Sequence, residues 1–257
     1  MTATRAASAP LSPLLVRLAQ ERATGALLRS TGVLYLSDGA VVHAESPSAP
    51  GIERLLTTGG RLPAEAWREA VDQAGAQCRI GHWLIDHRRL SAGEVEISQL
   101  GTLHDAAFFV LAPSGGPSRF RHGAEHWFGV VSAVPVHEVE REARRRRRLL
   151  DALWPHPGLD DAPLVRRPAA RLPPVTRRQR ALLDLADGSR TPAAIAAALG
   201  RPAFHTLVDV RRLAAAGHLA PPDGAPPTAR APLWFKDIGG DPDTAMLRRL
   251  RDALEHL

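Results

Sequence analysis

The sequence predicts an α+β fold in two parts: a small antiparallel sheet with helices in the N-terminal part, and a C-terminal part that is mainly α-helical. Three observations lead to this prediction. Apolar residues recur at helical spacing over much of the chain, two short strand-like runs flank Asp38-Gly39, and residues 155–175 hold six prolines and one glycine. The proline-rich stretch predicts a linker, so we expect folded domains over residues 10–154 and 176–232.

The composition indicates a soluble, globular protein. Of its 257 residues, 44% are hydrophobic and 23% are charged. No run of about 18 apolar residues occurs, so we expect neither a spanning helix nor a membrane partner. The first nine residues are small and polar and lack the apolar run of a secretory signal. Cys78 is the sole cysteine, which excludes an intramolecular disulfide and CxxC-type sites and favours a cytoplasmic location.

The positive charge is spread along the whole chain. Lysine and arginine number 33 against 27 acidic residues, a net charge of +6, and Lys236 is the one lysine. Residues 1–150 and 151–257 each carry an excess of +3, so neither half is a polybasic tail. Any contact with nucleic acid must therefore come from a local cluster of arginines, whose planar fork suits phosphate.

The N-terminal part begins with a helix over residues 11–20, where the leucines fall on one face. Strands are expected in residues 25–45, because Asp38-Gly39 accepts the positive φ of a tight hairpin turn. Helices are then expected over residues 50–58, 63–75, 79–87 and 91–111. Ser91 and Glu94 have the spacing of a capping box at the start of the last of them. A short strand at RFRHG and a long helix over residues 135–154 complete this part.

This order of elements resembles the PATAN domain, a module of bacterial signalling proteins, and the resemblance covers residues 10–154. The residues that carry it are Thr24-Gly25-Ala26-Leu27, Asp38-Gly39, Gly60, the series Gly81, Leu84, Leu90 and Glu94, and Glu142 to Arg145. The resemblance implies a signalling or protein-interaction module rather than an enzyme. Its partner would be another protein or a second copy of the chain.

The C-terminal part is expected to form three short helices between residues 176 and 216. Thr176 caps the first helix, and Thr191 caps the second with Pro192 at its first position. Gly200 lies in the turn before the third helix, and a wing strand would start after Gly217. Because a turn that contains glycine joins the second and third helices, residues 176–232 resemble a winged helix-turn-helix domain.

The resemblance implies that the third helix places its N-terminal part in the major groove of DNA. Residues 171–220 hold eight arginines against three aspartates, which favours a polyanionic partner. The candidate DNA-contact residues are Arg177, Arg178, Arg201, His205, Thr206, Arg211 and Arg212. These features predict a bacterial DNA-binding transcriptional regulator.

The alternative prediction is an adaptor in a signalling complex that makes only protein contacts. The expected third helix is rich in alanine and poor in side chains that read bases. Residues 233–257 contain a short amphipathic helix, which is marginal in water by itself. This helix is expected to dock on the rest of the chain or to pair with a second copy.

Three further motifs could carry chemistry. His122-Gly-Ala-Glu125-His126 has the H-x-x-E-H order of zinc proteases, but its neighbours favour a strand and a turn. Cys78 and His82 would share a face of a helix, yet no oxyanion donor accompanies them. We therefore expect no enzyme activity, no metal and no cofactor.

The third motif is the arginine run at residues 144–148. On a helix these side chains point in all directions, and the glutamates before them can pair with them. Arg147 and Arg148 are left as candidates for contact with phosphate, or with a nucleotide second messenger.

Overall fold

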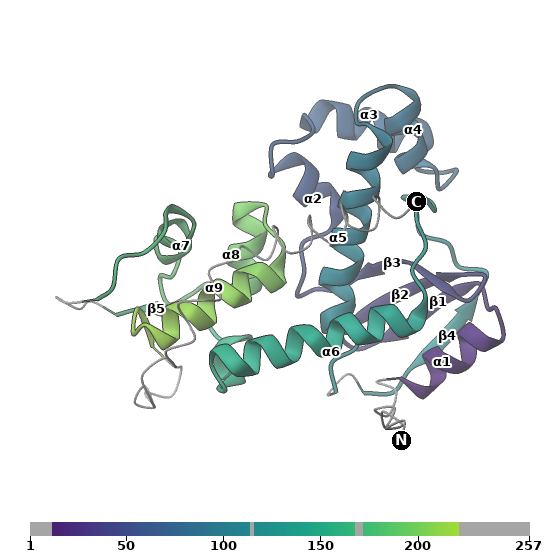
Figure 1. Ribbon diagram of the computed structural model, residues 1–257. Helices are drawn as coiled ribbons and strands as arrows, with labels where there is room; N and C mark the ends of the chain where they lie inside the picture. Colours follow the sequence, from purple (N-terminus) through teal and green to yellow (C-terminus); the bar gives the residue numbers. More distant parts are fainter. Residues whose placement is uncertain (1–11, 114–115, 168–171, 221–257) are drawn as a thin grey trace, which may run out of the picture.

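The computed structural model describes residues 12–113, 116–167 and 172–220. The expected N-terminal tail at residues 1–9, the end of the winged-helix-like region and the helix in residues 233–257 lie outside this part of the chain. The described residues form the α+β fold that the sequence predicts. A four-stranded sheet lies at one end and a group of short helices at the other, with a long helix running between them (Figure 1).

The sheet is antiparallel throughout, with strand order β3-β2-β1-β4. The strands are β1 (Gly25–Arg29), β2 (Gly32–Ser37), β3 (Ala40–Glu45) and β4 (Arg119–His122). Asp38 and Gly39 join β2 to β3 with φ angles of 50° and 80°. Positive φ at both positions is what a two-residue hairpin turn needs, so the predicted hairpin is confirmed.

Three helices share the main core with the sheet. They are α1 (Pro13–Gln20), α5 (Ala92–Val110) and α6 (Val136–Leu153). Leu27 and Leu34 of the strands, Leu103 of α5 and Val139 of α6 are all almost fully buried in this core. The predicted capping box of Ser91 and Glu94 is present at the start of α5. It fixes where the helix begins, and therefore which of its faces meets the sheet.

A second core is built by the helices that precede α5. These are α2 (Ile52–Thr57), α3 (Ala64–Ala74) and α4 (Ile80–Asp86). Trp67 of α3 and Leu84 of α4 pack there with Phe128, which comes from the segment between β4 and α6. The Gly81 N–H donates a hydrogen bond to the Phe128 carbonyl oxygen over 2.8 Å. A Cβ at Gly81 would lie 2.7 Å from Val131 Cγ2 and 2.9 Å from the Phe128 ring, so a larger residue would displace these side chains.

The C-terminal part contains the three predicted helices. The elements are the 3-10 helix η1 (Pro157–Leu159), β5 (Val165–Arg166), α7 (Arg177–Leu183), α8 (Pro192–Leu199), α9 (Ala203–Ala215) and β6 (Leu219–Ala220). The side chains of Thr176 and Thr191 cap α7 and α8, and Gly200 ends α8 in the left-handed conformation with φ 59°. Local sequence signals therefore placed all three helices correctly.

The described residues of the proline-rich stretch 155–175 are part of the C-terminal fold rather than a spacer. Leu159 and Leu164 are fully buried in the core of that half. β5 pairs antiparallel with β6, so the strand that follows α9 finds its partner within this stretch. The prolines interrupt regular structure, as predicted, but the leucines between them have enough apolar surface to anchor the segment.

The two halves are joined through α9, which packs against α5 and α6. Phe204, Leu207 and Val208 of α9 form a buried cluster with Phe108 of α5 and Leu150 and Leu153 of α6. The turn between α8 and α9 rests on the end of α2. A Cβ at Gly200 would lie 2.7 Å from backbone atoms of Thr58 and Gly59. None of the helices in the described ranges is long and apolar enough to cross a membrane.

This close approach predicts a difference between two glycines of similar conformation. Gly60 also has a positive φ, of 76°, but a Cβ there would meet nothing within 4 Å. Gly60→Ala should lower the free energy of unfolding by about 1 kcal/mol through backbone strain alone. Gly200→Ala should cost about 1–3 kcal/mol more, because the added methyl group overlaps the α2 end. Urea unfolding of the two variants measures this, and equal losses would show that the α8–α9 turn does not touch α2.

Candidate functional site

The N-terminus of α9, predicted to read DNA bases, is bound by a carboxylate of the other half. The Ala203 N–H donates to Asp105 Oδ2 over 2.7 Å, and the Phe204 N–H donates to Asp105 Oδ1 over 2.8 Å. Asp105 lies on α5 and its exposed fraction is 0%. It supplies the acceptors that a side-chain N-cap would otherwise give, because Pro202 at the N-cap position makes no side-chain hydrogen bond.

A buried arginine completes this contact. Arg146 of α6 places its Nη1 3.8 Å from Asp105 Oδ1 and its guanidinium carbon 4.6 Å from the centre of the Phe204 ring. Arg146 also donates to the His104 carbonyl oxygen and to Glu142, each over 3.0 Å. Burial raises the pKa of Asp105, while Arg146 and the two N–H groups act in the opposite direction. Through the buried side chains of Asp105 and Arg146, this contact joins α5, α6 and α9.

Two of the predicted DNA-contact residues have buried side chains. Arg211 is 1% exposed and donates to both carboxylate oxygens of Asp160, over 2.8 and 2.6 Å, as well as to the Trp154 carbonyl oxygen. Thr206 is 2% exposed, and its hydroxyl donates to the Pro202 carbonyl oxygen over 3.1 Å. Both face the packed sides of α9, so neither can reach a groove of DNA.

Arg178 and Arg201 lie together, and each donates a hydrogen bond within the protein. Arg178 Nε donates to Asp209 over 2.8 Å, and Arg201 Nη1 donates to the Arg178 carbonyl oxygen over 3.1 Å. Burial, and then the charge of Arg178, lower the pKa of Arg201. His205 and Arg212 are half-buried. The pair of Arg178 and Asp209 therefore joins α7 to α9.

Arg177, at the start of α7, is exposed, as is Arg180 further along the same helix. Arg211 and Thr206, in contrast, are buried. The structure thus does not assemble the seven predicted residues into one surface.

The arginine run at residues 144–148 serves mainly to hold helices. Arg145 is paired with Glu142 over 2.7 Å, and Arg146 is buried at the contact with α9. Arg147 donates to the Phe108 carbonyl oxygen of α5 over 3.0 Å, whereas Arg148 is exposed. The predicted pairing with preceding glutamates is confirmed for Arg144, Arg145 and Arg146.

The H-x-x-E-H motif forms a strand end and a turn, as predicted. His122 ends β4, and Gly123 follows with φ 68°. His126 instead binds Glu45, with its Nε2 3.0 Å from Oε1, while its Nδ1 accepts a hydrogen bond from the Phe128 N–H. Among the described residues, no group of three histidine, cysteine or acidic side chains could hold a metal ion.

The Cys78–His82 pair does not share a helix. Cys78 precedes α4 with φ 52°, outside the helix that carries His82. The geometry that would make the thiol and the imidazole neighbours is therefore missing.

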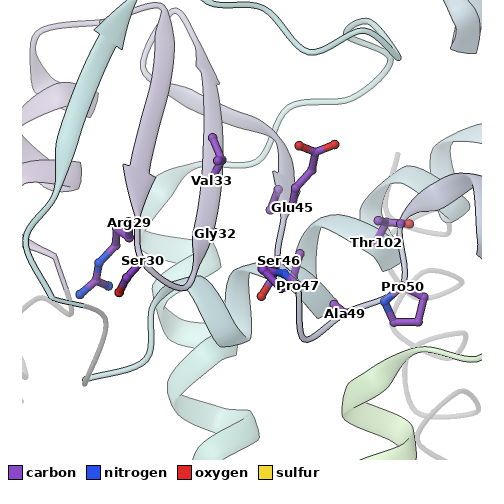
Figure 2. A pocket seen from close by; sticks show the side chains of 13 residues that line it. Arg29, Ser30, Gly32, Val33, Glu45, Ser46, Pro47, Ala49, Pro50 and Thr102 are labelled. Carbon is purple, nitrogen blue, oxygen red and sulfur yellow. The ribbon is translucent and has the colours of Figure 1, made fainter. Parts of the chain in front are cut away.

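A cavity of about 480 Å³ lies where the end of the sheet meets α5 (Figure 2). Its walls come from the β1–β2 turn, the end of β3, the segment leading to α2, and α5. The residues that line it are Arg29, Ser30, Gly32, Val33, Ala44, Glu45, Ser46, Pro47, Ala49, Pro50, Gly51, Thr102 and Ala106. Most of these side chains are small, and no motif in the sequence distinguishes them, so the cavity could not be predicted.

No protein-family model matches the chain, and comparisons with the curated proteins and with the solved structures give no match either. The resemblances to the PATAN domain and to winged helix-turn-helix domains therefore stay predictions.

A histidine beside Asp105 gives the contact between the halves a measurable pH dependence. Burial, and then the charge of Arg146, lower the pKa of His104 to about 4. The unfolded imidazole takes up a proton near pH 6.5 and the folded one near pH 4, so the free energy of unfolding should fall as the pH falls through this window. His104→Gln should remove about 3 kcal/mol of that fall.

Urea unfolding between pH 7 and pH 4 measures the effect. His122→Gln, at an exposed position, is the matched control for the loss of a histidine. An unchanged slope in His104→Gln would mean that His104 is accessible to protons in the folded protein.

Proposed function

We propose that this chain is a regulatory adaptor that acts through protein contacts in the bacterial cytoplasm. One observation carries the proposal: the helix that would read DNA has its N-terminus bound to Asp105 and its apolar face in a shared core with α5 and α6. A recognition helix must present its N-terminal residues to base edges. In this chain Ala203, Phe204 and Thr206 of that region are buried.

The joined halves suit an adaptor because they offer a composite surface. α9 holds the C-terminal helices against the PATAN-like half, so contacts made by each half are presented at a defined spacing. The resemblance of residues 10–154 to a signalling module also supports an adaptor function. Exposed apolar side chains that could meet partners occur on both halves, at Val71, Val130 and Val165.

DNA binding is the second candidate function, now through α7 rather than α9. Arg177 and Arg180 are exposed on that helix, and Arg166 and Arg190 are exposed in the same half. Arginines in such positions can meet phosphates, but phosphate contacts carry no sequence information. This route therefore supports weak, salt-sensitive binding rather than a specific regulator.

Fluorescence anisotropy with pooled genomic fragments separates the two candidates. At about 50 mM salt, where phosphate contacts are strongest, we expect no sequence-specific complex. Any weak binding should be lost in the Arg177→Glu/Arg180→Glu double variant and kept in Arg211→Gln, provided that circular dichroism shows both to be folded. A sequence-specific complex with a Kd on the order of 10 nM would contradict the adaptor proposal.

Site-specific photocrosslinking tests the adaptor directly. A photoreactive residue at Val71 or Val130 should capture the same protein in cells, and the purified pair should form a complex in calorimetry. Val71→Glu should weaken that complex by about 10-fold or more, because it places a charge in an apolar contact. Asp72→Asn, at the exposed neighbouring position, is the control. If no purified protein binds the chain directly, the adaptor proposal is wrong.

A further inference from the structure

Within the described ranges, one edge of the four-stranded sheet has no partner strand. This edge is β4, which pairs with β1 on its inner side and ends the sheet (Figure 1). The opposite edge, β3, is bridged to Val134. Three of the four residues of β4 are exposed, and Phe120 is half-buried. An open edge of this kind is a template on which a further strand can form.

The pairing with β1 identifies the backbone groups that point out of this edge. The Gly123 N–H donates to the Thr24 carbonyl oxygen over 3.0 Å, one position beyond the paired residues of the two strands. Hydrogen-bonded and non-hydrogen-bonded pairs alternate along an antiparallel ladder. Every second residue back from Gly123, which means Arg121 and Arg119, therefore bonds to β1. The residues between them direct their N–H and C=O groups outward.

These outward groups belong to Phe120 and His122, which offer two donors and two acceptors to a further strand. No hydrogen bond joins them to another segment in the described part of the chain. One residue of an added antiparallel strand would exchange two hydrogen bonds with Phe120, and the residue two positions away would do the same with His122.

The side chains along this edge are positive on one face of the sheet. Phe120 packs against the main core, so its neighbours Arg119 and Arg121 lie on the opposite face, because successive residues of a strand alternate. The two arginines are about 6.8 Å apart along the strand. Both are exposed, and neither is paired with an acidic side chain of the described residues.

This charge pattern disfavours pairing of the edge with a second copy of itself. An antiparallel pair of β4 strands centred on Phe120 would set Arg119 of each copy opposite Arg121 of the other. Like charges directly opposite each other destabilise a sheet, whereas opposite charges stabilise it. Side chains approach closely at these positions, because they would be the non-hydrogen-bonded pairs of the new ladder. Acidic residues are therefore the side chains that fit there.

We propose that the β4 edge binds an extended acidic segment of a partner protein, which adds antiparallel to the sheet as a fifth strand. The segment has two acidic residues separated by one apolar residue. The acidic side chains face Arg119 and Arg121, and the apolar side chain lies beside Phe120. Main-chain hydrogen bonds give affinity in such complexes, and alternate side chains give specificity. The inference rests on the adaptor function proposed above and specifies the chemistry of its partner.

Methylated peptides test the register. In the labelled, end-blocked peptide STEVETS, the valine is placed to pair with Phe120. Four main-chain hydrogen bonds and two ion pairs predict a Kd on the order of 100 µM, which fluorescence anisotropy measures. Methylation of the valine nitrogen removes a donor aimed at β4 and should weaken binding by about 10-fold or more. Methylation of the first glutamate nitrogen is the matched control, because that N–H points away from β4, and it should leave the Kd nearly unchanged.

Charge reversal tests the two arginines. In Arg119→Glu/Arg121→Glu, binding of STEVETS should fall by about 10-fold or more, and the peptide STKVKTS should bind instead. The fold should survive, since both positions are exposed, and circular dichroism checks it. Arg141→Glu/Arg148→Glu, at two exposed positions of α6, makes the same change in net charge and should keep the wild-type preference.

Amide hydrogen exchange in NMR spectra separates the possible occupants of the edge. In the free chain the Phe120 and His122 amides should exchange faster than those of Arg119 and Arg121, and saturating STEVETS should slow them. Protection of Phe120 and His122 in the free chain would mean that a second copy or another segment of the chain covers the edge. That result would overturn the proposal.

Two further results would also overturn it. One is equal weakening by the two methylations, which would show that only charge attracts the peptide. The other is the absence of binding at about 1 mM STEVETS, about ten times the expected Kd. The adaptor proposal fails or stands separately. A purified protein captured through Val71 that binds Arg119→Glu/Arg121→Glu as tightly as wild type would support an adaptor and exclude the β4 edge as its site.

Discussion

The buried carboxylate of Asp105 determines how the two halves of this protein are arranged. A helix N-terminus leaves N–H groups without partners, and most helices satisfy some of them with their own side chains. α9 begins at a proline and uses Asp105 of α5 instead. Arg146 then offsets the charge that burial makes costly. Asp105, Arg146 and the N–H groups at the start of α9 are partners of one another. The helices that carry them, α5, α6 and α9, therefore form one packed unit.

Because the start of α9 depends on Asp105, the helix-turn-helix pattern in this chain does not by itself indicate DNA binding. Three helices, two of them capped by threonines, with a glycine turn specify a compact scaffold, and nothing in that scaffold requires DNA. Here the turn between α8 and α9 contacts the end of α2. Arg211 donates hydrogen bonds to Asp160 and to the Trp154 carbonyl oxygen. Among the arginines that suggested a polyanion, Arg211 is buried and Arg178 is partly buried against Asp209, and in both the guanidinium binds a carboxylate of the protein.

Turns and helix caps could be predicted from the sequence, because they depend on residues close together in the chain. The Asp38-Gly39 turn and the caps at Ser91, Thr176 and Thr191 were all recognisable, because each depends on residues a few positions apart. The burial of Arg211 depends on Asp160, 51 residues away, and no spacing rule reveals such a pair. The cavity was hidden for another reason: it arises from small side chains on four separate segments, and small residues carry no periodic signal.

The apolar part of the contact argues that the halves stay together. Phe204 and Leu207 are each 2% exposed, and burying such a side chain stabilises the protein by about 1.5–3 kcal/mol. Pulling α9 away would expose these groups together with Phe108 and Leu150, and would leave the N–H groups at its start without Asp105. Separation would restore water to the Asp105 carboxylate and the Arg146 guanidinium, and this gain opposes the loss of all these contacts. Regulation that acts on the joined unit therefore requires a smaller change than regulation that separates the halves.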